Sequence, residues 1–151
     1  ANNIKVVDAS WLIANGTVGN CVEKTFIDKD GLAYAMPAKN DPIVNSLNTM
    51  LGGATLNADE FSKISVVIKT SDISKVAGMQ SKIYFANDTV KLSEANTVKT
   101  TWPSTASADG TVTLTFNMKS NAAWAGEMTV VRFDPFDFVT DFSVVSITFA
   151  P

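Results

Sequence analysis

The sequence predicts an all-β protein, built as a sandwich or a barrel of short strands. Three observations favour this fold class. No apolar pattern of helical period is sustained, strand-like runs recur along the chain, and clusters of Gly, Pro, Asn and Asp separate them. The length of 151 residues and the hydrophobic content of 46% fit one domain, 1–151, with a single core.

Nine segments carry the strand pattern, because they are rich in β-branched and aromatic residues. In chain order they are 4–7, 22–27, 32–36, 62–70, 80–86, 97–102, 110–117, 127–134 and 142–149. The turn residues between them lie in 28–31, 39–42, 51–53, 57–60 and 106–110. We also expect one helical turn at Asn57, whose side chain can cap it together with Glu60, three residues on.

Alternation of apolar and polar residues predicts which side chains of two strands face the core. In 80–86, Ile83 and Phe85 are expected to be buried. The opposite face then carries the polar side chains of Gln80, Lys82 and Tyr84. In 110–117 the threonines point outward, and the core receives Val112, Leu114 and Phe116.

The segment 124–135 holds the only arginine of the chain, Arg132. Alternation puts this side chain on the face opposite to Val131 and Phe133. Two interpretations stay open. Arg132 forms an ion pair with Glu127 or with an Asp of another strand, or it contacts a ligand on a polar sheet face. A guanidinium offers several fixed donors and can bridge two sugar hydroxyls.

Charge and hydropathy exclude several classes of partner. The net charge is −3, and the lysines are spread along the chain rather than gathered on one segment. A phosphate backbone or an anionic membrane surface requires a basic face, so we expect neither nucleic acid nor membrane as a partner. No apolar run approaches the ~18–20 residues that span a bilayer.

The absence of histidine excludes most catalytic and zinc sites. Ser-His-Asp and Cys-His triads and the usual zinc sites all need this residue. Cys21, the single cysteine, is expected to be a small buried residue. Most of the acids lie in turns, without the apolar setting that raises a catalytic pKa. The sequence therefore predicts a protein that is not an enzyme.

Several short motifs follow one another in a recognisable order. They are Asp30-Gly31-Leu32, Asn40-Asp41-Pro42-Ile43, 56–61, 62–69, 82–85, 124–135 and 142–149. This order resembles the galactose-binding-like jelly-roll modules, which are carbohydrate-binding modules of bacterial polysaccharide hydrolases and surface-layer proteins. The resemblance covers about 30–149, and 124–135 is its most specific motif.

The resemblance implies a jelly-roll β-sandwich that acts as a non-catalytic carbohydrate-binding module. Its partner would be a polysaccharide or an oligosaccharide. The parent would be a larger, multidomain bacterial protein that is secreted or held at the cell surface, and a start at Ala1 fits a processed form or an excised module. The rival hypothesis is a structural or interaction module of a surface protein, without a sugar ligand.

A sugar-binding surface needs a flat aromatic ring for stacking and polar groups for the hydroxyls. We expect Trp102 and Trp124 to stack on sugar rings, although each can also belong to the core; Trp11 and Tyr34 are further candidates. The hydrogen-bonding residues are expected to be Gln80, Lys82, Tyr84 and Arg132.

This function requires no cofactor, but the galactose-binding-like modules that the chain resembles often hold a structural Ca²⁺. The closing strand of such modules usually carries an Asp, where this chain has Val145, and the first 29 residues match poorly. Whether this chain holds a structural Ca²⁺ therefore stays open. Its candidate ligands are Asp28, Asp30, Asp41 and Asp134.

Overall fold

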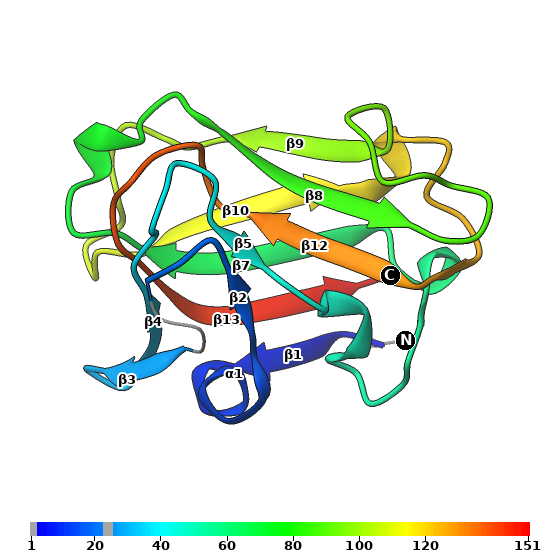
Figure 1. Ribbon diagram of the computed structural model, residues 1–151, viewed down its shortest axis with the longest axis horizontal. Coiled ribbons are helices and arrows are strands. Elements are labelled where there is room, and N and C mark those ends of the chain that lie inside the picture. Colours follow the sequence, from blue (N-terminus) through cyan, green and yellow to red (C-terminus); the bar gives the residue numbers. More distant parts are fainter. Residues whose placement is uncertain (1–2, 23–25) are drawn as a thin grey trace.

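The computed structural model describes residues 3–22 and 26–151, with the backbone alone for 27–29. It is a β-sandwich in which two antiparallel sheets lie face to face (Figure 1). This is the all-β jelly-roll class that the sequence pattern and the resemblance predict. Among the described residues, no helix is both long and apolar enough to cross a membrane.

One sheet is built around β13, the longest strand, which pairs with three others. The order of its strands is β10-β7-β13-β4-β3, and β1 pairs with the C-terminal half of β13. The bounds are β1 (Lys5–Asp8), β3 (Ile27–Lys29), β4 (Leu32–Ala35), β7 (Lys63–Lys69), β10 (Val112–Asn117) and β13 (Phe142–Ala150).

The other sheet, in front in Figure 1, has the order β2-β5-β12-β8-β9. Its strands are β2 (Val18–Gly19), β5 (Ile43–Val44), β8 (Gln80–Ala86), β9 (Thr97–Thr101) and β12 (Val130–Asp134). A separate pair joins β6 (Leu56–Asn57) to β11 (Glu127–Met128).

Short helices connect the strands. They are α1 (Ala9–Asn15), η1 (Leu47–Thr49), η2 (Ala58–Glu60), η3 (Ile73–Lys75) and η4 (Met118–Ser120). The expected turn after Asn57 is confirmed as η2, where the Asn57 side chain accepts a hydrogen bond from the Asp59 amide at 3.0 Å. Helix α1 was not predicted; it begins after Asp8, whose carboxylate accepts from the Trp11 amide at 3.0 Å.

Two predicted strands differ from the structure. Segment 127–134 is split at Thr129, whose amide donates to the Ala86 carbonyl at 3.0 Å, so its two parts join different sheets. In the predicted 22–27 strand, Val22 is exposed in a bend and 23–25 lie outside the described residues. Strand β3 instead starts at Ile27, and Asp30 and Gly31 adopt positive φ in the following turn.

The core lies between the two sheets, and the predicted alternation is confirmed there. The side chains expected to face inward are all buried: Ile83, Phe85, Val112, Leu114, Phe116, Val131 and Phe133. Phe116 of β10 meets Phe133 of β12 edge to face, with ring centroids 6.1 Å apart. Cys21 is buried, as expected.

Strand β13 contains a β-bulge. Val144 pairs with Ile68 of β7 and Ser146 pairs with the next residue, Val67, so that Val145 has no partner of its own in the ladder. Val144 and Ile147, on either side of the bulge, both point into the core. The extra residue therefore changes the register of the strand without changing its buried face.

Candidate functional site

The structure brings the four predicted polar side chains onto one outward surface. We refer to the surface formed by Gln80, Lys82 and Tyr84 of β8 and Arg132 of β12 as the β8–β12 face. The two strands are paired with Arg132 directly opposite Tyr84. Since the intervening residues of both strands are buried in the core, these four side chains must point away from it.

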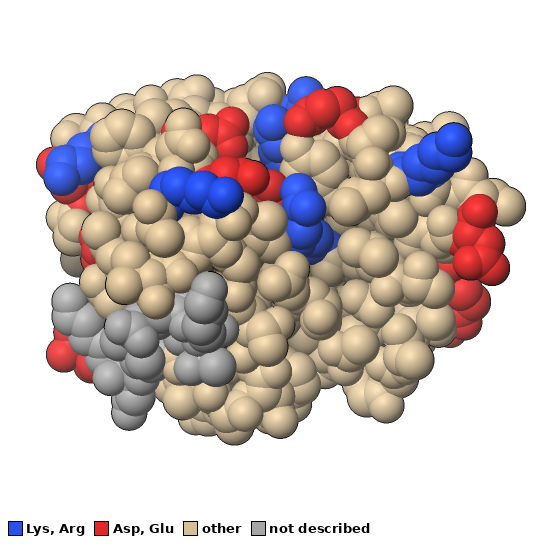
Figure 2. All heavy atoms as spheres, viewed as in Figure 1, with Lys and Arg blue, Asp and Glu red and all other residues tan. Residues whose placement is uncertain are grey.

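Charges of both signs lie together on this face. Figure 2 shows the side of the sandwich that carries it, with positive and negative side chains intermixed over β8 and β12. Mixed signs produce no strong net field. The face is therefore suited to a neutral, hydroxyl-rich ligand rather than to a polyanion.

Arg132 forms an ion pair with a residue of its own strand, Asp134. Its Nε and Nη2 donate to the two carboxylate oxygens at 2.9 and 3.1 Å. The prediction of a partner on another strand, or of Glu127, is wrong: Glu127 lies on β11, where its carboxylate accepts from the Thr55 hydroxyl at 3.3 Å. The ion pair uses two of the five guanidinium donors, so others remain for a ligand.

Asp134 is buried, with 4% of its surface exposed. Burial, opposed by the Arg132 guanidinium and assisted by the nearby Asp41 and Asp137 carboxylates, raises the pKa of its carboxyl to about 6. Arg132 is thus held in place by a carboxylate that needs it as a counter-charge.

Tyr84 lies beside Arg132 on the β8–β12 face. The Arg132 guanidinium stacks over its ring, with Cζ 4.3 Å from the ring centroid. Its hydroxyl donates to the Glu94 carboxylate, which also pairs with the Lys82 ammonium at 3.3 Å and the Lys99 ammonium at 3.7 Å. Burial, followed by the contact with Glu94, raises the pKa of Tyr84, so the phenol stays protonated at neutral pH.

Glu94 was not predicted as a site residue. It lies in the connection between β8 and β9, where no periodicity indicates the direction of a side chain. The Tyr84 hydrogen bond and the neighbouring lysines lower the pKa of Glu94. The sequence offers only a weak signal for its role, namely an acidic residue a few positions before Lys99, with which it pairs in the structure.

The predicted stacking roles of Trp102 and Trp124 are wrong, because both rings are buried, at 1% and 2% exposure. The indole N–H of Trp102 donates to the Pro135 carbonyl at 2.7 Å, and that of Trp124 donates to the Phe61 carbonyl at 2.8 Å. Neither ring presents a face to a ligand. Both belong to the core, which was the alternative interpretation of each residue.

Two candidate calcium ligands, Asp41 and Asp134, lie near each other, but no three acidic or cysteine residues form a metal-binding group in the described part of the chain. Asp30 is exposed in the β3–β4 turn, and Asp134 is engaged by Arg132. The Asp41 main-chain carbonyl accepts from the Asn20 amide group at 2.7 Å. The side chain of Asp28 lies outside the described residues.

The fold is similar to that of several solved carbohydrate-binding modules. One is the low-affinity xylan-binding module CBM86 from Roseburia intestinalis (TM-score 0.52, 16% identity, 98% of this chain and 96% of that one). Others are a point mutant of a family 29 module (0.56, 11%, 99% and 92%) and the xylan-binding module CBM15 (0.55, 13%, 99% and 97%). At these identities the likeness shows the fold alone. The sequence matches no protein-family model and no curated protein.

Proposed function

We propose that this protein is a non-catalytic carbohydrate-binding module that binds a polysaccharide on the β8–β12 face. The observation that carries the proposal is the gathering of Gln80, Lys82, Tyr84 and Arg132 on one outward surface of adjacent strands. The similarity in fold to xylan-binding and other carbohydrate-binding modules, over almost the whole of each chain, supports it.

Binding on this face would rest on hydrogen bonds from side chains that are already oriented. Arg132 is fixed by Asp134, and Tyr84 and Lys82 are fixed by Glu94. Little side-chain freedom is lost when such groups meet a sugar hydroxyl, which lowers the cost of binding.

Affinity is expected to be modest. Each protein–sugar hydrogen bond replaces one with water and contributes only about 0.5–1.5 kcal/mol. Without a tryptophan platform, the dissociation constant would be on the order of micromolar or weaker. A module of this kind serves to hold its parent protein on a polysaccharide outside the cell or at the cell surface.

Truncation of single polar residues on the face is expected to weaken binding without unfolding the protein. Gln80→Ala and Lys82→Ala should each reduce affinity by about 3–10-fold, because one hydrogen bond contributes about 0.5–1.5 kcal/mol. Affinity electrophoresis in gels containing soluble xylan, glucan or mannan measures this as a loss of retardation. Thr113→Ala, an exposed change on β10 of the other sheet, is the matched control and should be retarded like the wild type.

Two outcomes would contradict the proposal. Unchanged mobility of the wild-type protein in every polysaccharide would exclude sugar binding, and release of reducing sugar from any of them would indicate an enzyme. If no polysaccharide is bound, the interaction-module hypothesis gains support from one hollow whose lining combines exposed apolar side chains with the charged Lys5 and Asp8. This hollow, of about 370 Å³, is lined by Ile4, Val6, Trp11 and Leu51 among others.

A further inference from the structure

The Glu94 carboxylate joins side chains of two neighbouring strands on the β8–β12 face. Its Oε1 accepts from the Tyr84 hydroxyl and from the Lys82 ammonium at 3.3 Å, and its Oε2 pairs with the Lys99 ammonium at 3.7 Å. Lys82 of β8 and Lys99 of β9 are paired directly across the two strands. Glu94 therefore extends the face from β8 toward β9, although it belongs to the connection between them.

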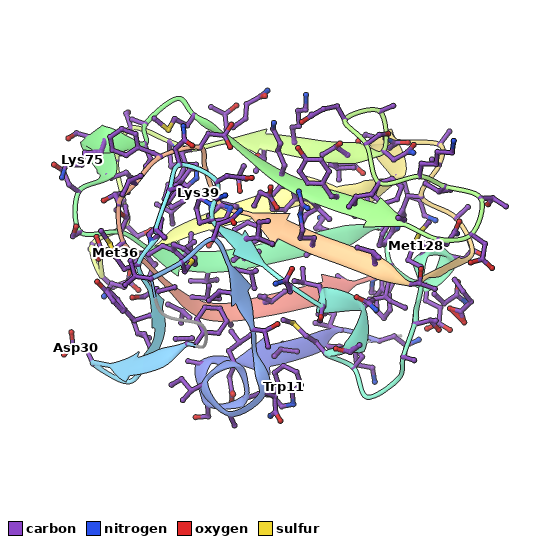
Figure 3. All side chains as sticks on the ribbon, viewed as in Figure 1. Trp11, Asp30, Met36, Lys39, Lys75 and Met128 are labelled. Carbon is purple, nitrogen blue, oxygen red and sulfur yellow. The ribbon has the colours of Figure 1, made fainter. Side chains whose placement is uncertain are left out.

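The connection between β8 and β9 is held in place by hydrogen bonds near both of its ends. At its start, the Asn87 side-chain amide donates to the Met128 sulfur at 3.7 Å; Met128 is labelled in Figure 3. At its end, the hydroxyl of the buried Thr97 donates to the main-chain carbonyls of Ser93 and Glu94 at 3.0 and 2.7 Å. The backbone of Glu94 is thus fixed without a ligand, which lowers the cost of ordering this residue on binding.

The Glu94 carboxylate keeps hydrogen-bonding capacity for a ligand. A carboxylate offers about four lone-pair sites, and the bonds from Tyr84 and Lys82 both use Oε1. The Lys99 ammonium stands 3.7 Å from Oε2, which is beyond the distance of a hydrogen bond. Because the Glu94 side chain is 62% exposed, a sugar hydroxyl can reach Oε2 from the solvent.

The contact with Glu94 also determines how Tyr84 can bond to a ligand. Since the phenol donates its only proton to Glu94, the Tyr84 oxygen can act toward a ligand only as an acceptor. The proton stays on Tyr84 at neutral pH, because burial and the Glu94 contact raise the pKa of the phenol and the same hydrogen bond lowers the pKa of Glu94. Tyr84 and Glu94 therefore present two neighbouring acceptors, while Lys82 and Arg132 supply donors.

We propose that Glu94 is a specificity-determining residue of the β8–β12 face, which together with Tyr84 accepts hydrogen bonds from free hydroxyls of a neutral polysaccharide. The inference rests on the proposed carbohydrate-binding function and names the class of ligand, a polysaccharide whose hydroxyls are unsubstituted. An ether or ester at these hydroxyls removes the donor and leaves two acceptors facing a third, which disfavours the substituted ligand.

The test compares the wild type with Glu94→Gln by affinity electrophoresis in gels that contain soluble xylan, glucan, mannan or polygalacturonate. For a neutral polysaccharide that retards the wild type, Glu94→Gln should bind about tenfold more weakly, because hydrogen bonds to a charged acceptor are the stronger ones. Glu60→Gln, the same change of charge at an exposed position of η2, is the matched control and should bind like the wild type. O-methylation of the same polysaccharide replaces its hydroxyl donors with ethers and should remove the difference between the wild type and Glu94→Gln.

The outcomes separate this inference from the proposed function. A wild type that no polysaccharide retards overturns both. Retardation that Lys82→Ala weakens and Glu94→Gln does not overturns the inference and leaves the proposed function standing. If Glu94→Gln strengthens the binding of polygalacturonate and leaves neutral polysaccharides unaffected, Glu94 only screens Lys82 and Lys99 from an acidic ligand, and the inference is overturned. A difference between the wild type and Glu94→Gln that persists on the O-methylated polysaccharide overturns the selection of free hydroxyls.

Discussion

Replacing Trp124 with alanine is expected to lower the free energy of unfolding by about 3–5 kcal/mol, the cost of deleting a large buried aromatic side chain. The ring packs edge to face on Phe85, with centroids 5.1 Å apart, and its removal leaves a cavity beside β8. The change also removes the donor for the Phe61 carbonyl, to which the indole N–H is bonded at 2.8 Å. A buried carbonyl without a donor costs about 1–3 kcal/mol and is part of this loss.

Urea-induced unfolding, followed by tryptophan fluorescence or circular dichroism, measures this loss. Trp124→Phe is the matched variant: it keeps much of the apolar volume and loses the hydrogen bond, so a smaller loss of about 1–3 kcal/mol is expected. Trp102→Ala should resemble Trp124→Ala, since its ring lies 5.7 Å from that of Phe136 and its N–H is bonded to the Pro135 carbonyl. A stable Trp124→Ala variant that fails only to bind sugar would contradict the core role and return the residue to the binding surface.

Replacing Arg132 with methionine is expected to destabilise the protein in a pH-dependent manner. At pH 8 the change leaves the buried Asp134 carboxylate without its counter-charge, and the free energy of unfolding should fall by about 3 kcal/mol or more. At pH 5 the Asp134 carboxyl, with a pKa of about 6 in the native protein, already carries a proton. The loss at pH 5 should therefore be limited to the packing of the arginine stem, about 1 kcal/mol or less.

The sign of this effect follows from proton linkage. The native pKa of Asp134, about 6, exceeds its ordinary value of 3.8, so the native state binds the proton more tightly than the unfolded chain. The contribution of this group to stability then declines as the pH rises from about 4 to about 6. Asp72, Glu94 and Asp109 have pKa values lowered from 3.8, 4.5 and 3.8, so their contributions are lost only as the pH falls below these values, which is below the pH range of 5 to 8 that tests Arg132.

Unfolding curves in urea at pH 5 and pH 8 measure the difference. The Asp134→Asn background is the control, because an uncharged amide needs no counter-charge and Arg132→Met should then cost about the same at both pH values. An equal loss at pH 5 and pH 8 in the wild-type background would mean that Arg132 stabilises the sheet through packing alone.

The strands with one buried and one solvated face were predictable from the sequence. In β10 the apolar residues alternate strictly, and in β8 Ile83 and Phe85 alternate with more polar neighbours; the structure confirms the bounds of β8 and the burial of the inward side chains of β10. Strands β2, β5 and β6 contain two residues each, which is too short for any period to show. The break at Thr129 was equally hidden, because the strand pattern runs through it while the pairing partner changes.

The candidate site was predictable only where it depends on alternation. The outward positions of Tyr84 and Arg132 follow from their strands, and both were anticipated. Trp124 was misjudged because only small residues, 122–123 and 125–126, flank it in the sequence, and such neighbours can leave a ring accessible. Its partners are instead Phe85 and Phe61, which are distant in sequence, and no local pattern reports such contacts.

The bulge in β13 determines where the length of this chain can vary. The side chains of β13 that face the core are Phe142, Val144, Ile147 and Phe149. If Val145 is left out, Val144, Ser146 and Ile147 alternate without interruption, and every inward residue keeps its direction. The loss of any residue inside a regular stretch of this strand would turn the remainder over and bring Ser146 or Thr148 to the inside. A homologue one residue shorter at Val145 would thus be expected to share the same core, and an alignment of this fold should place its gap there.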